Sequence, residues 1–191
     1  MGRPRNFDTD AVVDRAMDAF WTHGYANTSP AQLASATGIG KGSLYNTFGS
    51  KRALFERALA RYNRAGAELA AECMSRPGTA RDCIGDFLRL LVDSDLADPT
   101  RRGCLAVNTA TEFSGRDPEI IRAVADMQER TVATLAARID QGRRDGDVAR
   151  DTDPRGAAEF LMNTISGLRV MAKTSEASTL YRIIDSALKT L

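Results

Sequence analysis

Residues 28–51 read TSPAQLASATGIGKGSLYNTFGSK and predict a helix, a tight turn and the start of a second helix. Ser29 can cap the first helix, and Pro30 suits its first helical position. Gln32 stands where a capping box has its second member. Gly38 is expected to end the helix, because the left-handed backbone of a helix end favours glycine.

The second predicted helix runs from about residue 41 to residue 48 and has two unlike faces. Leu44 and Phe48 lie four residues apart and therefore share one buried stripe. The remaining face is small and polar, and it consists of Lys41, Ser43, Tyr45, Asn46 and Thr47. Such a face suits a helix in the major groove of DNA, because donors point outward and little bulk holds the helix away.

This segment resembles the helix-turn-helix of the TetR family of dimeric transcriptional repressors. The resemblance covers about the first third of the chain and rests on many fixed offsets: Leu33-Ala34, Gly38-Ile39, Gly42, Leu44-Tyr45, Phe48 and Ser50-Lys51. Two positions depart from the family pattern. Gly40 replaces a serine that would cap the second helix, and Thr47 stands where histidine or tyrosine is common.

The resemblance implies a homodimeric repressor that a small molecule or an electrophile releases from a palindromic operator in double-stranded DNA. It implies that Tyr45, Lys51 and Thr28 contact backbone phosphates. Side-chain chemistry makes the polar residues of the second helix candidates for base edges, since lysine can address guanine and asparagine can pair with adenine. The predicted DNA-binding residues are Arg3, Arg5, Thr28, Ser29, Gln32, Lys41, Gly42, Ser43, Tyr45, Asn46, Thr47 and Lys51.

Charge is distributed unevenly along the 191 residues, although the net charge is only +1. Residues 1–64 hold nine Lys/Arg against five Asp/Glu, whereas the remainder holds 17 against 20. A basic N-terminal part on a mildly acidic body indicates phosphate binding confined to the N-terminal part. The arginine arm, Arg3 and Arg5, is expected to enter the minor groove on DNA; in the free protein it could be a disordered tail.

The composition argues against several other classes of protein. No apolar run approaches the roughly 20 residues of a membrane span, and the charged N-terminus lacks a signal region, so we expect a cytoplasmic protein without a membrane partner. Three cysteines and one histidine fit neither a disulfide framework nor a zinc site, and no cofactor is expected. A histidine-based catalytic triad in the body is excluded because His23 lies in the N-terminal part.

Apolar spacing predicts an all-α fold of about nine helices. We expect a DNA-binding domain at 1–50 and an effector-binding and dimerisation domain at 51–191, with a connecting helix from about 51 to 75. A helix at 80–92 should be followed by a polar break at 93–100.

The body is expected to enclose an effector pocket and to form the dimer. Bulky apolar residues mixed with amides suit a small-molecule site, and the predicted lining is Phe87, Leu91, Cys104, Asn108, Phe113, Met127, Phe160, Asn163 and Met171. The resemblance implies that the last two helices pack against their symmetry copies; the alternative is that their apolar stripes belong to a closed monomer core. The predicted interface residues are Phe160, Ile165, Leu168, Leu180, Ile183, Ile184, Ala187 and Leu188.

Cys104 follows Arg101, Arg102 and Gly103 at an expected helix start. Two arginines and a helix N-terminus favour a thiolate, and the resemblance implies that some similar regulators sense electrophiles through a cysteine at this place. The alternative is a small buried apolar residue. Cys73 and Cys83 show no comparable basic neighbourhood in the sequence.

Two other functions remain open from the residues alone. The N-terminal helices could form a module that binds protein, and abundant carboxylates leave a small all-α enzyme conceivable. The basic N-terminal part and the small polar face favour DNA binding over both.

Overall fold

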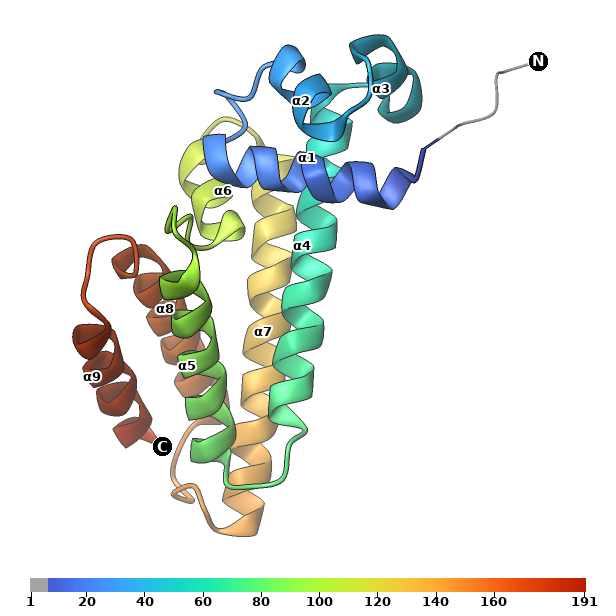
Figure 1. The fold of residues 1–191 in the computed structure, drawn as a ribbon. Helices are drawn as coiled ribbons and strands as arrows, with labels where there is room; N and C mark the ends of the chain where they lie inside the picture. The colour runs from blue at the N-terminus through green and yellow to red at the C-terminus, as the bar shows by residue number, and fades with distance from the viewer. Residues whose placement is uncertain (1–6) are drawn as a thin grey trace. The chain divides into compact units, whose positions relative to one another are not determined.

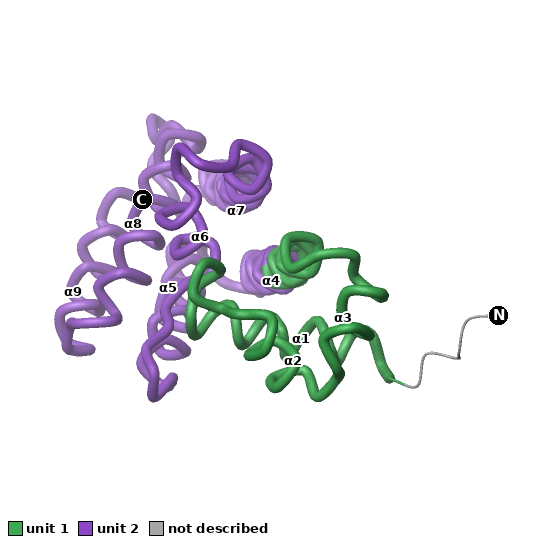
Figure 2. The backbone as a smooth tube through the Cα atoms, turned by 90° about the horizontal axis from the view of Figure 1, so that it is seen from above, with its two compact units in different colours: residues 1–62 green, residues 63–191 purple. Residues whose placement is uncertain are grey.

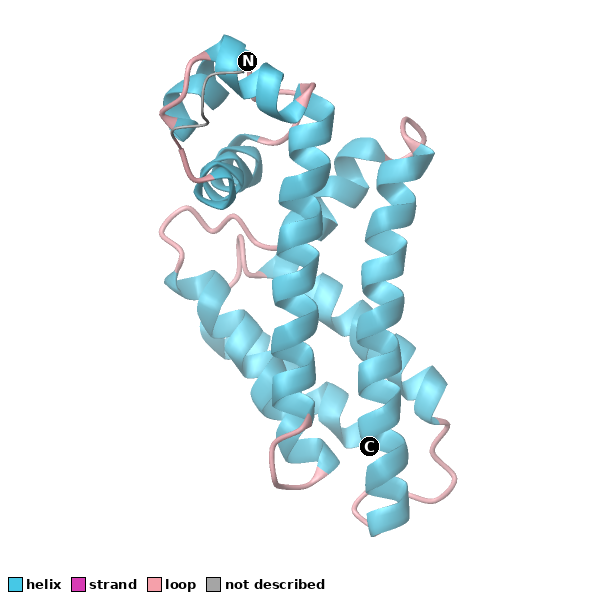
Figure 3. Cartoon of the chain, turned by 90° about the vertical axis from the view of Figure 1, so that its right-hand side faces the viewer, coloured by secondary structure: helices cyan, strands magenta, loops and turns pink. Residues whose placement is uncertain are grey.

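The computed structural model describes residues 7–191, and within this range the chain forms only helices (Figures 1 and 3). The predicted all-α fold of about nine helices is confirmed. The predicted arginine arm, Arg3 and Arg5, lies outside the described residues. No helix within residues 7–191 combines the length and the apolar character that a membrane span requires.

The chain divides into two compact units, residues 1–62 and residues 63–191 (Figure 2). Unit 1 contains α1 (Thr9–His23), α2 (Pro30–Thr37), α3 (Lys41–Phe48) and the first half of α4 (Lys51–Met74). Unit 2 contains the rest of α4 and then α5 (Ala80–Ala97), α6 (Leu105–Phe113), α7 (Pro118–Asp145), α8 (Pro154–Met171), α9 (Ala177–Ala187) and the short 3-10 helix η1 (Leu188–Thr190). A functional boundary after residue 50 stays a prediction.

Unit 1 has a small core that residues from each of its helices complete. The rings of Phe20 from α1 and Phe55 from α4 meet edge to face, with centroids 5.1 Å apart. Leu33 and Leu44 are fully buried and bring α2 and α3 to the same core. Because these four side chains come from four different helices, the core fixes how α3 is presented.

Unit 2 is held together by a larger hydrophobic core. Buried residues from α4, α5, α7, α8 and α9 form one cluster that includes Ile84, Leu135, Leu161 and Leu180. Local signals set the helix starts: Thr79 and Asp82 form a capping box on α5, and Asp117 and Asp153 cap α7 and α8 ahead of a proline.

Candidate DNA-binding site

The turn into α2 is built as the sequence predicts. The Ser29 hydroxyl accepts a hydrogen bond from the Gln32 N–H at 3.2 Å, and the Gln32 side chain accepts one from the Ser29 N–H at 2.7 Å. Gly38 ends the helix with a φ of 73°. Two orphan donors of the helix start are therefore satisfied reciprocally.

Helix α3 presents the polar residues on its surface. Leu44 and Phe48 are buried in unit 1, whereas Lys41, Gly42, Ser43 and Asn46 are exposed. Tyr45 and Thr47 lie half-buried at the edge of that exposed group. The structure thus brings the predicted base-contacting residues together on one short helix, which we call the α3 face (Lys41, Gly42, Ser43, Tyr45, Asn46 and Thr47).

The stretch of sequence that contains the α3 face carries no acidic residue. Between Asp18 and Glu56 the sequence has no Asp or Glu, and it has Lys41, Lys51 and Arg52. Four of the five acids of unit 1 belong to α1 or its N-cap, where the Arg61 guanidinium pairs with the Asp14 carboxylate. The fifth, Glu56, lies on α4 and pairs with Arg52. A surface without carboxylates approaches the phosphate backbone without like-charge repulsion.

Two predicted phosphate contacts have other partners in the structure. Thr28 is fully buried, and its hydroxyl donates to the Gly24 carbonyl at 2.5 Å, so it holds the connection after α1 together. The structure therefore contradicts the predicted phosphate contact of Thr28. The Lys51 ammonium lies 4.3 Å from the centre of the Tyr25 ring, a cation–π contact that sequence reasoning missed.

The predicted effector-pocket residues do not form one buried set. Phe87, Cys104, Phe113 and Met127 are buried, and Leu91 and Asn108 are half-buried. The α8 residues Phe160, Asn163 and Met171 are exposed. The predicted place of these three in an enclosed pocket is wrong for this structure, because α8 turns them to the outer surface of unit 2.

The side-chain amide of Asn108, a predicted ligand contact, is hydrogen-bonded at both ends to other residues of the same chain. Its amide nitrogen donates to the Arg102 carbonyl at 3.0 Å, and its amide oxygen accepts from the Lys173 ammonium at 2.7 Å. Both ends of the amide therefore hold the connection before α6.

Cys104 is the N-cap of α6, at the helix start where the sequence places it. The two arginines before it have other acceptors. The Arg101 guanidinium donates to the Ala172 and Ser175 carbonyls at 2.9 and 3.2 Å, and Arg102 pairs with Asp98 at 2.8 Å. This pairing holds the pKa of the Asp98 carboxyl well below its usual range. The expected activation of Cys104 by free arginines therefore has less support than the sequence suggests.

Helix α5 runs beyond its predicted end, and the added turn carries a buried acid, Asp95. Asp95 and Arg169 are nearly inaccessible, and their charged atoms lie 2.5 Å apart. Burial raises the pKa of Asp95, and the Arg169 charge opposes this shift. The polar break expected at 93–100 is therefore wrong in part, because α5 runs to Ala97 and Asp95 faces inward.

Most of the predicted dimer residues already lie in the core of unit 2. Ile165, Leu168, Leu180, Ile184, Ala187 and Leu188 are buried within the single chain. Within this structure they are therefore not free to contact a second copy, which corrects their predicted role. Phe160 is 46% exposed, and Ile183 is half-buried.

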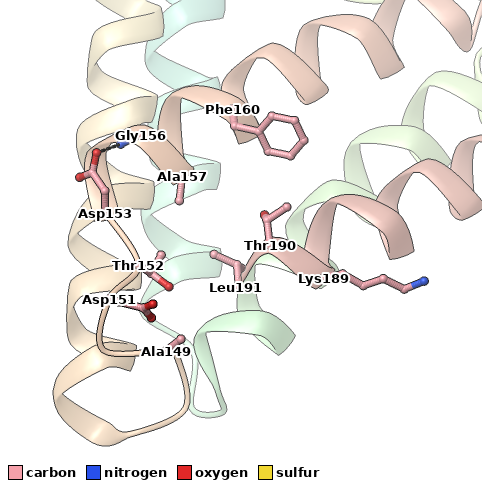
Figure 4. A pocket seen from close by; sticks show the side chains of 10 residues that line it. All are labelled: Ala149, Asp151, Thr152, Asp153, Gly156, Ala157, Phe160, Lys189, Thr190 and Leu191. Carbon is pink, nitrogen blue, oxygen red and sulfur yellow. Dashed lines mark hydrogen bonds between the residues drawn. The ribbon is translucent and has the colours of Figure 1, made fainter.

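Phe160 lies where two surface hollows meet. One has a volume of about 490 Å³ and lies between the start of α8 and the last residues of the chain, with Ala157 and Leu191 in its lining (Figure 4). The other has a volume of about 480 Å³, and its lining combines Thr164 of α8 with Ile183 of α9. We call this surface the α8–α9 face (Phe160, Thr164, Ile183 and their neighbours in the two hollows).

Comparison with known proteins identifies the family. Residues 12–58 match the model "Bacterial regulatory proteins, tetR family", and residues 84–188 match "Tetracyclin repressor-like, C-terminal domain". The transcriptional repressor ComR of Escherichia coli is 32% identical over 100% of this chain and 90% of its own. The uncharacterised regulator YezE of Bacillus subtilis is 33% identical over 100% of both chains.

Solved structures agree with these relatives. The TetR family regulator CifR, in a cysteine-substituted form complexed with operator DNA, has a TM-score of 0.88 and 34% identity over 98% of each chain. Reduced NemR of Escherichia coli shares the fold, with a TM-score of 0.82 and 22% identity over 94% of this chain and 92% of its own. The chain therefore belongs to the TetR family of bacterial regulatory proteins and is a DNA-binding transcriptional regulator.

Proposed function

We propose that this regulator is a homodimeric repressor that binds a palindromic operator through the α3 face and leaves it when an effector binds unit 2. The observation that carries the proposal is an exposed polar helix in a stretch of sequence without carboxylates. ComR and BdcR of Escherichia coli, both about one-third identical to this chain, are named repressors, and CifR is complexed with operator DNA. Access to such DNA would place the protein in the bacterial cytoplasm.

The α8–α9 face supports the dimer. Four large apolar side chains are exposed within residues 7–191, and three of them, Phe160, Val170 and Met171, belong to α8. Of these side chains only Phe160 lines the two hollows, and an exposed aromatic side chain there suits a surface that a partner covers. A two-fold dimer would present two α3 helices to half-sites about 34–36 Å apart.

Unit 2 is the proposed place of the effector. Phe87, Phe113 and Met127 are buried apolar residues of α5, α6 and α7, and they could line a site for a small molecule. An electrophile that reacts with Cys104 is the alternative effector, and in that case the N-cap thiol would be the reacting group.

Binding to DNA tests the proposal directly. Fluorescence anisotropy with the duplex upstream of the protein's own gene should show tight binding that weakens steeply with salt, as released counterions require. A duplex of scrambled sequence should bind much more weakly. Equal binding of both duplexes would argue for a nonspecific or protein-binding surface.

Asn46→Ala and Tyr45→Ala should differ in kind. Loss of the asparagine amide should remove about 1–2 kcal/mol of discrimination at one base pair. Loss of the tyrosine hydroxyl should weaken binding to every sequence alike. Competition with operators substituted at single base pairs separates the two effects, and Lys51→Ala, which also removes the contact with Tyr25, should resemble Tyr45→Ala. Wild-type binding by all three variants would show that the α3 face is misassigned.

Gly40→Ser should stabilise α3. Gly40 is the N-cap and offers no side-chain hydrogen bond, its φ is −59°, and a Cβ atom there would meet no neighbour within 4 Å. Serine can cap the helix, so the free energy of unfolding should rise by a few tenths of a kcal/mol, at most about 1 kcal/mol. Urea unfolding of the two proteins measures the difference, and a lower midpoint for the serine variant would contradict the assignment of the cap.

A further inference from the structure

The turn between α4 and α5 connects two buried cysteines. Cys73 lies in the last turn of α4 and Cys83 in the first turns of α5, and both thiols are free. The Arg76 N–H donates to the Cys73 carbonyl at 3.3 Å, and the Cys83 thiol donates to the Arg76 carbonyl at 3.3 Å. A single residue of the turn thus contacts both cysteines.

Cys83 has a cationic neighbour that the sequence did not reveal. The Arg138 guanidinium, from α7, donates to the Cys83 sulfur at 3.5 Å and to the Gly78 carbonyl. The buried Arg138 Nε has no hydrogen-bond acceptor, and within residues 7–191 Arg138 pairs with no carboxylate. The guanidinium beside the sulfur is therefore not neutralised by an acid, and a neighbouring cation is a common feature of reactive cysteine sites.

The surroundings of the Cys73 thiol differ from those of the Cys83 thiol. Burial raises the pKa of the Cys73 thiol, and the nearby charges of Glu72 and Asp86 add to this effect, while Arg76 opposes it. The pair is therefore asymmetric: a guanidinium lies beside the Cys83 sulfur, whereas burial disfavours the thiolate of Cys73.

We propose that Cys73 and Cys83 form a redox-active dithiol that responds to peroxides. The Cys83 thiolate attacks one oxygen of a hydroperoxide, the O–O bond breaks, and the sulfur becomes a sulfenic acid while hydroxide or alkoxide leaves and takes up a proton. The Cys73 thiol then attacks this sulfur, forming the disulfide and releasing water. Two thiols are oxidised, and one peroxide is reduced.

Residues 75–78, which form the turn between α4 and α5, are exposed. Local opening of this turn is the route by which a small oxidant reaches the Cys83 sulfur. A disulfide would tie the end of α4 to the start of α5. Helix α4 is continuous from unit 1 into unit 2, so this link restrains the helix that leaves the DNA-binding unit. If the proposed repressor function holds, oxidation should also change operator affinity.

The chain has three cysteines, so mass spectrometry can distinguish every possible pairing. The full-length protein and Cys104→Ser are treated with hydrogen peroxide, quenched with acid, denatured and analysed without reductant. Both should lose two titratable thiols and two hydrogen atoms of mass, and their digests should contain a peptide that joins Cys73 to Cys83 in one chain. Dithiothreitol should restore both thiols.

Variants test the roles of the groups. Cys73→Ser should accumulate a sulfenic acid on Cys83 that dimedone traps, and Arg138→Met should slow disulfide formation several-fold, whereas the control Arg130→Met on the same helix should not. A disulfide that contains Cys104, or three intact thiols after a treatment that oxidises a cysteine peptide, would overturn the proposal. Because these readouts need no operator, their failure is separate from failure of the repressor function.

Discussion

Gly42→Glu is expected to weaken specific operator binding strongly while leaving the fold intact. Gly42 lies on the α3 face, is exposed, and a Cβ atom there would meet nothing within 4 Å in its own chain. A glutamate in the first turn also favours the helix dipole, so unit 1 should not lose stability. On DNA the same carboxylate is repelled by the backbone phosphates, which should reduce the binding free energy by about 3 kcal/mol and raise Kd roughly a hundredfold.

The matched control is Gly66→Glu on α4. Gly66 is equally exposed, and its Cβ position is equally open, but it lies outside the helix-turn-helix. Anisotropy with the operator should show wild-type affinity for Gly66→Glu and a loss for Gly42→Glu, while both variants keep a wild-type melting curve. Equal affinity of the two variants would place the DNA elsewhere on the protein.

Phe160→Glu is expected to separate the dimer. Phe160 is exposed in the single chain, so a charge costs the monomer little, but a dimer through the α8–α9 face would bury it. Without the partner, the second α3 helix no longer binds at high effective concentration, and operator affinity should fall about 10²–10⁴-fold.

Sedimentation velocity and anisotropy check this prediction together. Leu90→Glu is the control, because Leu90 is also an exposed large apolar residue but lies on α5. It should remain a dimer with wild-type affinity. A Phe160→Glu dimer that still binds the operator would locate the interface on another surface.

Deletion of the chain from Leu180 onward would be a poor test of dimerisation. Leu180 and Ile184 are fully buried in unit 2. Their loss would remove core packing within one chain, at about 2–5 kcal/mol per residue for comparable truncations. A point change on the exposed face avoids this ambiguity.

The fold could be predicted because its signals are local. Capping residues, prolines at helix starts and apolar spacing act within a few positions, so the starts of α2, α7 and α8 follow from Ser29, Asp117 and Asp153. The two faces of α3 follow from the spacing of Leu44 and Phe48 in the same way.

The wrong predictions concern side chains whose partners lie far away in the sequence, or apolar stripes that suit a core and an interface equally well. Asp95 looks like a surface acid until Arg169, 74 positions later, pairs with it. Arg138 reaches Cys83 across 55 positions. Amphipathic spacing on α8 and α9 cannot tell a core stripe from an interface stripe, because both are apolar. The folded structure distinguishes the two, because Ile184 is fully buried whereas Phe160 is 46% exposed.

Selection of binding sites from random duplexes tests the central claim, that α3 reads an operator as part of a dimer. The selected sequences should form a palindrome whose half-site centres lie about one helical turn apart. Repeating the selection with Asn46→Ala should relax one symmetric pair of positions and leave the others unchanged. The claim would be contradicted if the wild-type protein selected no common sequence. It would also be contradicted if Asn46→Ala and Gly42→Glu selected the same palindrome with unchanged preference at every position.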